Sequence, residues 1–127
     1  MWSDDAEGKV LYVQTHGVDD PGRCATPFFL AAAAAAMECD VAIYFTMYGP
    51  QLLQKDVIDK IGPKGDRGQP LRYFIDQALG VGVKLLVCQP SLDLNDLTLD
   101  ELIPEVQMIG GAAFNDIAMR ADAVISF

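Results

Sequence analysis

The amino-acid sequence predicts a single α/β domain of three layers, in which helices cover both faces of a doubly wound, mainly parallel sheet of about five strands. Two features of the sequence lead to this prediction. Apolar, β-prone segments alternate with helical segments along the chain, and several of the β-prone segments are continuously apolar. Strands buried on both faces of a parallel sheet have this composition. The length of 127 residues suits one domain with a sizeable core.

The first half of the chain contains two predicted strands with a helix between them. The strands are Lys9–Thr15 (KVLYVQT) and Asp40–Phe45 (DVAIYF). Residues 26–39 (TPFFLAAAAAAMEC) are predicted to form the helix, because Thr26 is a suitable N-cap and Pro27 suits the first helical position. The alanine run has high helix propensity, and it makes a thin helix that can pack close to a sheet or to another subunit.

The second half of the chain continues the alternation. Its predicted elements are a helix at residues 71–80 (LRYFIDQALG), a strand at residues 83–88 (VKLLVC), a strand at residues 105–110 (EVQMIG), a helix at residues 111–121 (GAAFNDIAMRA) and a terminal strand at residues 122–127 (DAVISF). Thr98 and Glu101 have the spacing of a capping box, which predicts that a helix starts there. Pro104 interrupts that helix, so the segment after it is assigned to a strand. Pro90 breaks the strand pattern after Cys88, so Cys88 is expected to face a loop.

The overall charge of the chain limits its partners. The net charge of −9 argues against nucleic-acid binding, which depends on Lys and Arg, and against an anionic membrane surface. Residues 1–8 (MWSDDAEG) are predicted to be a flexible tail before the domain at residues 9–127, and they lack the features of a signal peptide. The sequence therefore predicts a cytoplasmic protein whose cysteines, Cys24, Cys39 and Cys88, are reduced thiols.

A parallel sheet of this kind places its functional residues beyond the carboxyl ends of the strands. The residues predicted there are Thr15, His16 and Gly17 after the first strand, Thr46, Met47 and Tyr48 after the second, and Cys88, Gln89 and Ser91 at the third. Cys88 is the candidate catalytic residue, since an ionised and reachable thiol is a nucleophile. The alternative is that Cys88 only fills space. Cys24 lies near the same edge, whereas Cys39 lies at the opposite edge and is interpreted as packing.

Other side chains at this edge have two interpretations each. His16 is either a base or ion partner, or a hydrogen-bonded loop histidine, while Tyr48 either lines a pocket or is an ordinary rim aromatic, which the sequence favours. Three features are candidates for lowering the pKa of a thiol at this edge: the side chain of His16, the side chain of Arg23, and the start of the helix predicted near Thr98. The loop after the first strand lacks a phosphate-binding motif, and one histidine with scattered cysteines gives no metal site, so no cofactor and no metal are predicted.

The segment around Cys88 resembles the DsrE-like (DsrEFH/Tus) family of sulfur carriers and sulfurtransferases, in particular its stand-alone branch. In that family a Gly-Val strand ends in a cysteine, a small polar residue follows, and the chain closes on an aD-x-v-x-x-F pattern. The matching positions here are Gly82 and Val83, Cys88, Ser91, and residues 121–127. Residues 22–36 (GRCATPFFLAAAAAA) resemble the family's first helix, and residues 48–65 (YGPQLLQKDVIDKIGPKG) resemble the loop and helix of the stand-alone branch.

The resemblance implies a flavodoxin-like, DsrE-type fold and a function. Cys88, rigid at a strand end but exposed to a docking partner, is expected to take up sulfane sulfur as a persulfide or thiosulfonate and to pass it to a partner protein in sulfur trafficking or oxidation. His16, Cys24, Tyr48 and Ser91 are expected to assist or to line the pocket. The implied partners are sulfur donor and acceptor proteins, an inorganic donor such as thiosulfate or polysulfide, and further copies in a homotrimer or homohexamer. The alternative is a non-catalytic structural subunit of a sulfur-relay hetero-oligomer.

The sequence departs from this family in two places. The region after Cys88 contains LNDL where Tus-type proteins carry an Arg-Arg-Gly run, which favours sulfur oxidation or general trafficking over tRNA thiolation. Some relatives carry a second cysteine eight residues after the first, and this chain has Asp96 there. Cys24 is therefore the only candidate for a second functional thiol.

Overall fold

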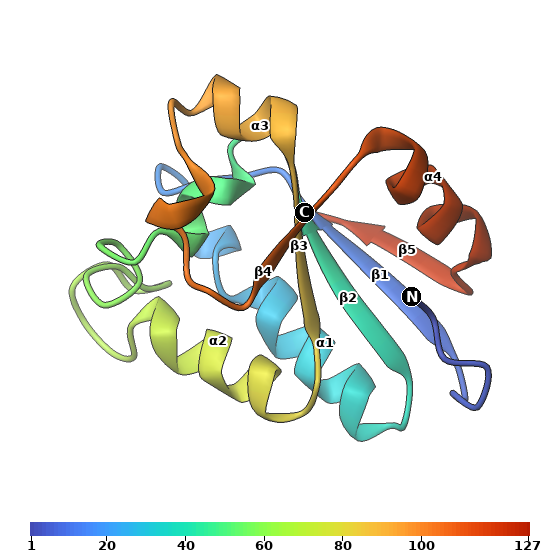
Figure 1. Cartoon of the computed structure of the whole chain (residues 1–127). Helices are drawn as coiled ribbons and strands as arrows, with labels where there is room; N and C mark the ends of the chain where they lie inside the picture. The colour runs from blue at the N-terminus through green and yellow to red at the C-terminus, as the bar shows by residue number, and fades with distance from the viewer.

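The computed structural model describes residues 1–127 and contains one five-stranded sheet with four α-helices (Figure 1). The strands are β1 (Lys9–Gln14), β2 (Asp40–Phe45), β3 (Lys84–Cys88), β4 (Val106–Ile109) and β5 (Ala123–Ser126). The helices are α1 (Thr26–Ala36), α2 (Leu71–Gly80), α3 (Gln89–Leu94) and α4 (Gly111–Arg120). Short 3-10 turns lie at Pro21–Arg23, Gly49–Leu53 and Leu99–Glu101. The predicted fold class is confirmed.

The sheet has the strand order β4-β3-β2-β1-β5, and all four pairings are parallel. The chain adds β2, β3 and β4 on one side of β1, and then returns to place β5 on the other side. This reversal puts α1 and α2 on one face of the sheet and α4 on the opposite face, as Figure 1 shows. The carboxyl ends of all five strands consequently meet at a single edge, and α3 lies above it.

Two hydrophobic cores lie on the two faces of the sheet. The larger core, on the α1 and α2 face, contains 22 buried residues, and the smaller core, on the α4 face, contains seven. Alternate residues of β1, β2 and β3 enter the two cores, as the two-residue period of a strand requires. In α1, Ala31 and Ala34 are buried against the sheet, so the alanine run forms the closely packed helix that its composition predicts. Strands β1, β2 and β3 supply six residues of the smaller core, and α4 covers them with one buried residue, Ile117.

The ends of two predicted helices were wrong. Thr26 is not the N-cap of α1; Ala25 occupies that position with helical dihedral angles, because the preceding 3-10 turn runs almost directly into the helix. The same helix ends at Ala36 rather than at residue 39, since Glu38 adopts a left-handed conformation with φ of 69°. The capping box at Thr98 is present, but it starts a 3-10 turn of three residues and not an α-helix.

The segment after Cys88 was predicted to be a loop, and it is the helix α3. Pro90 was interpreted as the break in the strand pattern. In the structure it lies in the first turn of α3, where the fixed φ of proline suits a helix and its missing N–H is not needed. Cys88 therefore lies between a strand and a helix, with no intervening loop.

The N-terminal residues contact the smaller core. Trp2 packs against this core, and its indole Nε1 donates a hydrogen bond of 3.0 Å to the carbonyl of Ile117 in α4. The backbone N–H of Ser3 donates to Asp40 at 2.6 Å. These contacts place the tail beside α4, and the flexibility of residues 1–8 stays a prediction.

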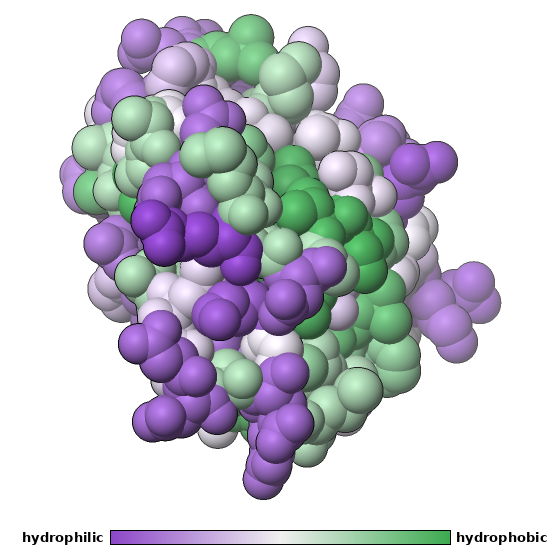
Figure 2. Space-filling view, turned by 90° about the vertical axis from the view of Figure 1, so that its right-hand side faces the viewer, coloured by the Kyte–Doolittle hydropathy of each residue, from purple (hydrophilic) through white to green (hydrophobic).

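The side of the molecule that carries α4 and β5 exposes hydrophobic surface. Figure 2 views this side and shows a hydrophobic area among polar side chains. The large hydrophobic residues that α4 and β5 expose are Met119, Val124 and Ile125, with exposed fractions of 79%, 48% and 41%. All four residues of β5 are exposed, and β5 is an edge strand whose outer side has no partner strand. Edge strands of this kind offer a surface for pairing with another chain.

Candidate functional site

Cys88 is the last residue of β3, at the carboxyl edge of the sheet. Its side chain lies on the α4 face, within the smaller core that also contains Leu86 two residues earlier. The residue is 7% exposed. The expected exposure of this thiol to a docking partner is therefore wrong for the single chain, because neighbouring side chains of the smaller core cover it.

Ser91 lies next to the thiol because α3 begins directly after it. Cys88 is the N-cap residue of α3, and a residue three positions further along a helix returns to the same side. The Oγ atom of Ser91 lies 2.6 Å from the Sγ atom of Cys88, and Ser91 is itself buried. The helix thus brings together the two residues that the sequence indicated at the end of this strand.

Thr46 completes a compact group of three polar side chains. It follows β2 directly, and its Oγ1 atom lies 3.5 Å from the Cys88 sulfur and 3.2 Å from Ser91 Oγ. The backbone N–H of Met47 donates to Ser91 Oγ at 2.9 Å. Two adjacent strand ends therefore surround the thiol with hydroxyl groups.

Hydrogen bonding at this site favours the ionised form of the thiol. Burial raises the pKa of Cys88, but hydrogen bonds from the side chains of Ser91, Thr46 and Tyr44 and from the backbone N–H of Ser91 outweigh it. The pKa of Cys88 consequently lies below its ordinary value. All of these donors are uncharged, so hydroxyl groups here take the place of the cationic neighbour that thiolates often use.

Tyr44 acts as one of these donors from within β2. Its ring stacks on Phe114 of α4, with 4.2 Å between the ring centroids. Burial raises the pKa of the Tyr44 phenol, and the neighbouring Cys88 raises it further. The phenol therefore keeps its proton at neutral pH and can direct it toward the sulfur.

The other residues predicted for this site lie apart from the thiol. His16 contacts Thr15 through Nδ1 at 3.2 Å and approaches Asp20 at 3.9 Å. Cys24 is fully buried in the larger core, on the opposite face of the sheet, and burial raises its pKa to about 11. Tyr48 is 49% exposed and lies at the rim of the same edge.

Arg23 and the turn near Thr98 do not supply the positive charge or helix dipole that the sequence suggested for the thiol. Arg23 pairs instead with Asp20, at 3.3 Å between Nε and Oδ2. The helix that begins at Cys88 is α3, and the turn at Leu99–Glu101 comes later. Sequence reasoning missed Tyr44 because it looks like an ordinary buried strand residue, while Thr46 was visible as the residue directly after β2.

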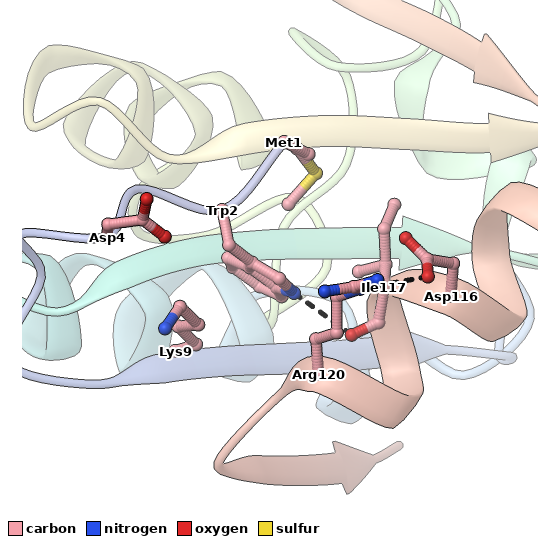
Figure 3. Close-up of a pocket in the computed structure, with 7 residues that line it drawn as sticks. All are labelled: Met1, Trp2, Asp4, Lys9, Asp116, Ile117 and Arg120. Atoms are coloured by element: carbon pink, nitrogen blue, oxygen red, sulfur yellow. Dashed lines mark hydrogen bonds and ion pairs between the residues drawn. The ribbon is translucent and has the colours of Figure 1, made fainter.

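Two surface hollows lie on the α4 side of the molecule. The first, of about 450 Å³, is drawn in Figure 3 and is lined by Met1, Trp2, Asp4, Lys9, Asp116, Ile117 and Arg120. The second, of about 230 Å³, is lined in part by Leu86 and Ile109, which also pack in or against the core around Cys88. The second hollow therefore opens on the same face of the sheet as the thiol.

Neither a metal cluster nor a membrane span is apparent in the fold. No group of three or more His, Cys, Asp or Glu side chains lies in an arrangement that could hold a metal ion. No helix has the length and apolar character needed to cross a membrane.

Replacing Ser91 by alanine is expected to slow alkylation of Cys88 at pH 7 by roughly tenfold, because a hydrogen bond to an ionised group contributes about 1.5–3 kcal/mol. Without that donor the pKa of Cys88 rises, so the pH profile of the alkylation rate shifts to higher pH. The rate of reaction with iodoacetamide is followed at the Cys88 peptide by mass spectrometry. Ser126→Ala, the same change on the exposed strand β5, is the matched control. Equal pH profiles for Ser91→Ala and the control would show that Ser91 does not lower the pKa of Cys88.

Comparison with known proteins assigns the fold to a family. A model of the DsrE/DsrF-like family matches residues 8–127. The chain belongs to the DsrE/DsrF-like family. The resemblance seen in the sequence is thereby confirmed, and the match leaves out most of the N-terminal tail.

One relative is similar to the chain in sequence, and two solved structures are similar to it in fold. The chain is 29% identical over 134 aligned positions to the sulfur carrier protein DsrE2 of Allochromatium vinosum, with 76% of this chain and 84% of that protein covered. The crystal structure of the ychN protein from E. coli superposes with a TM-score of 0.77 and 16% identity, over 94% of this chain and 99% of that one. A protein of unknown function from Methanobacterium thermoautotrophicum superposes with a TM-score of 0.62 and 13% identity, over 94% and 97% of the two chains. The two structures support the fold.

Proposed function

We propose that this protein is a sulfur carrier that takes up sulfane sulfur on Cys88 and passes it to a partner protein. The observation that carries the proposal is a single thiol at the carboxyl edge of the sheet whose pKa is lowered by surrounding hydroxyl groups. Membership of the DsrE/DsrF-like family and the similarity to a protein named as a sulfur carrier support the general role. The assignment to Cys88 rests on the geometry.

The proposed uptake step is a displacement at sulfur. The Cys88 thiolate attacks the outer sulfur of a donor persulfide, forms a new S–S bond, and releases the donor as its thiolate, which leaves Cys88 as a persulfide. With thiosulfate the same attack releases sulfite. With tetrathionate it releases thiosulfate and leaves a thiosulfonate on Cys88. Each step moves one electron pair from the broken S–S bond to the leaving group, so no external oxidant or reductant is needed.

The hydroxyl groups around Cys88 support the reactant and the product of this step. Ser91, Thr46 and Tyr44 donate to the thiolate before the attack, which raises the fraction of the nucleophilic form at neutral pH. The delivery step is the reverse displacement, in which a partner thiolate attacks the outer sulfur and Cys88 leaves as a thiolate. A stabilised thiolate is a good leaving group, so the same hydrogen bonds serve both directions.

Access to Cys88 favours small donors over direct contact with a large surface. The residue is 7% exposed, and the hollow beside Leu86 and Ile109 opens on its face of the sheet. Small anions such as thiosulfate or a polysulfide fit this access, and a partner protein is expected to present an extended cysteine rather than a flat surface. The three free cysteines suit a reducing compartment, and we infer that the protein is cytoplasmic.

The exposed hydrophobic residues of α4 and β5 support assembly of several copies, as the resemblance led us to expect. Met119, Val124 and Ile125 lie on the side that also carries the open edge of β5. Burying them between copies would remove apolar surface from water and give the edge strand a partner. A homotrimer or homohexamer is therefore part of the proposal, and the mass in solution measures it.

The proposal is tested by intact-protein mass spectrometry after the reduced protein is incubated with polysulfide, thiosulfate or tetrathionate. We expect a mass increase that corresponds to one or more sulfur atoms, or to a thiosulfonate with tetrathionate, and that disappears on reduction. Peptide analysis is expected to locate the adduct on Cys88. A protein that forms no adduct with any of these donors is not a sulfur carrier.

The second candidate function is a non-catalytic structural subunit of a sulfur-relay hetero-oligomer. The low exposure of Cys88 is the observation that favours it. A structural subunit would leave Cys88 unmodified by every donor, and its assembly would be unaffected by substitution of the thiol. The mass measurement therefore separates the two functions.

A further inference from the structure

A series of hydrogen bonds leads from the loop after β1 to the backbone of Met47 and Ser91, near the thiol at the end of β3. It begins at the backbone N–H of Val18, which donates to Gln51 Oε1 at 3.0 Å. Gln51 Nε2 donates to Asn95 Oδ1 at 2.9 Å. Asn95 Nδ2 then donates to the carbonyl oxygens of Met47 at 2.8 Å and Ser91 at 2.6 Å. These hydrogen bonds therefore join the loop after β1, the turn that contains Gln51 and the end of α3, which are far apart in the sequence.

The direction of every bond in this series follows from its first member. A backbone N–H can only donate, so the atom of Gln51 that receives it is the side-chain oxygen. The nitrogen of Gln51 must then face Asn95, and it can only meet the Asn95 oxygen. This leaves the Asn95 nitrogen, which has two hydrogens, facing two carbonyl oxygens that can only accept. No other orientation of the two amides satisfies all of these partners.

The carbonyl that Asn95 holds belongs to an unusual residue. Met47 has a φ of 54°, the left-handed conformation that residues with side chains rarely adopt. This conformation aims the backbone N–H of Met47 at Ser91 Oγ, at 2.9 Å. A hydroxyl that accepts this bond still has its own hydrogen, and the acceptors within reach of that hydrogen are Cys88 Sγ at 2.6 Å and Thr46 Oγ1 at 3.2 Å.

We propose that Asn95 and Gln51 are positioning residues, which hold the backbone of Met47 and of Ser91 so that the Ser91 hydroxyl donates to the sulfur of Cys88. Neither side chain is recorded in a hydrogen bond to the sulfur. Asn95 contacts α3 and the loop after β2 together, so the two sides of the site keep a fixed separation. Gln51 sets which way the amide of Asn95 points. The proposal deepens the proposed function and depends on it only for its biological meaning.

The close approach of Gln51 to the loop after β1 supports a positioning role for the Gln51 side chain. A Cβ atom added at Gly17 would lie 2.2 Å from Gln51 Oε1 and 2.7 Å from the carbonyl of Tyr48. Only glycine therefore leaves room for the Gln51 amide at this place. The groups that face Cys88 are Ser91 from α3, the phenol of Tyr44 from β2 and Thr46 from the loop after β2, and none of them carries a charge at neutral pH. A change in the pH profile of the thiol consequently reports on hydrogen-bond donors.

The test measures the rate of Cys88 alkylation by iodoacetamide as a function of pH, in Asn95→Leu and Gln51→Met. Each change keeps the approximate size of the side chain and removes its hydrogen bonds. We expect a fall of about threefold to tenfold in the rate at pH 7 and a midpoint displaced to higher pH, since the lost bonds let Ser91 turn away from the sulfur. Asn115→Leu, the same substitution at an exposed position of α4 with no recorded side-chain hydrogen bond, is the control.

The possible results distinguish failure of the positioning roles from failure of the proposed sulfur-carrier function and from a folding defect. Thermal unfolding is recorded first, and if Asn95→Leu does not fold, Gln51→Met alone decides, because its side chain lies further from the thiol. An unchanged pH profile in the folded variants, alongside a displaced profile in Ser91→Ala, would overturn the proposal. Displaced profiles in a protein that takes up no sulfur would instead overturn the proposed function and leave the positioning roles intact.

Discussion

Cys88→Ser is expected to take up no sulfur from polysulfide, thiosulfate or tetrathionate, whereas the wild-type protein does. A serine hydroxyl stays protonated at neutral pH, so the nucleophile of the proposed displacement is lost altogether. The smaller oxygen atom fits the space of the sulfur and keeps partners in Ser91 and Thr46, which lie 2.6 Å and 3.5 Å from the present sulfur. The fold should therefore survive, and intact-protein mass spectrometry gives the result directly.

Cys24→Ala is the control for this loss. Cys24 is fully buried in the core on the other face, and burial raises its pKa to about 11, so it is expected to contribute no adduct. Alanine avoids placing an unpaired hydroxyl in that core. An adduct that persists in Cys88→Ser, or that vanishes in Cys24→Ala, would assign sulfur uptake to a different thiol and contradict the proposed site.

Gly49→Ala is expected to lower the free energy of unfolding by about 3 kcal/mol, near the upper end of what an overpacked core usually costs. An added Cβ would lie 2.4 Å from the carbonyl oxygen of Gln14 and 3.2 Å from its carbonyl carbon. These are backbone atoms of β1, which lies inside the sheet between β2 and β5, and the same oxygen accepts the N–H of Thr46 at 3.0 Å. Neither side can yield without disturbing the sheet, and urea denaturation measures the effect.

Gly80→Ala is the matched control for Gly49→Ala. Gly80 is the last residue of α2, and an added Cβ there meets no atom within 4 Å. Alanine has a higher helix propensity than glycine, so this variant should unfold at the same or a slightly higher urea concentration. A Gly49→Ala protein as stable as the control would show that the turn at residues 46–49 can move. Because that turn also presents Thr46, the unstable variant should react more slowly at Cys88.

The sequence predicted the sheet well because the strands have a strong compositional signal. The strand Asp40–Phe45 has its predicted bounds, and the strand after Pro104 is present as β4. Continuous apolar runs between Gly-rich loops leave few alternatives to a buried parallel strand. The helix ends were less well predicted, since Ala25 and Glu38 take their conformations from turns that local propensity does not specify.

Only part of the site could be found from the sequence. Cys88 and Ser91 could be predicted because they lie at the end of a strand. Their spacing of three residues brings them into contact because α3 begins directly after Cys88. The helix was missed because Pro90 was read as a break, although proline is also common in a first turn. Tyr44 could not be found, because an aromatic residue in a buried strand has the same pattern whether or not its hydroxyl faces a thiol.

The three cysteines lie at different places in the molecule. Cys88 faces the α4 side, and Cys24 lies in the core on the other side of the sheet. Cys39 packs against the same core as Cys24, but it precedes β2 at the opposite edge of the sheet. A disulfide requires Cα atoms within about 7 Å, so the intervening sheet keeps Cys24 and Cys88 from bonding. Oxidants therefore cannot join Cys24 to Cys88, and under the proposed function the Cys24 thiol cannot release a sulfur loaded on Cys88 as sulfide. We expect that sulfur to leave by transfer to a second molecule.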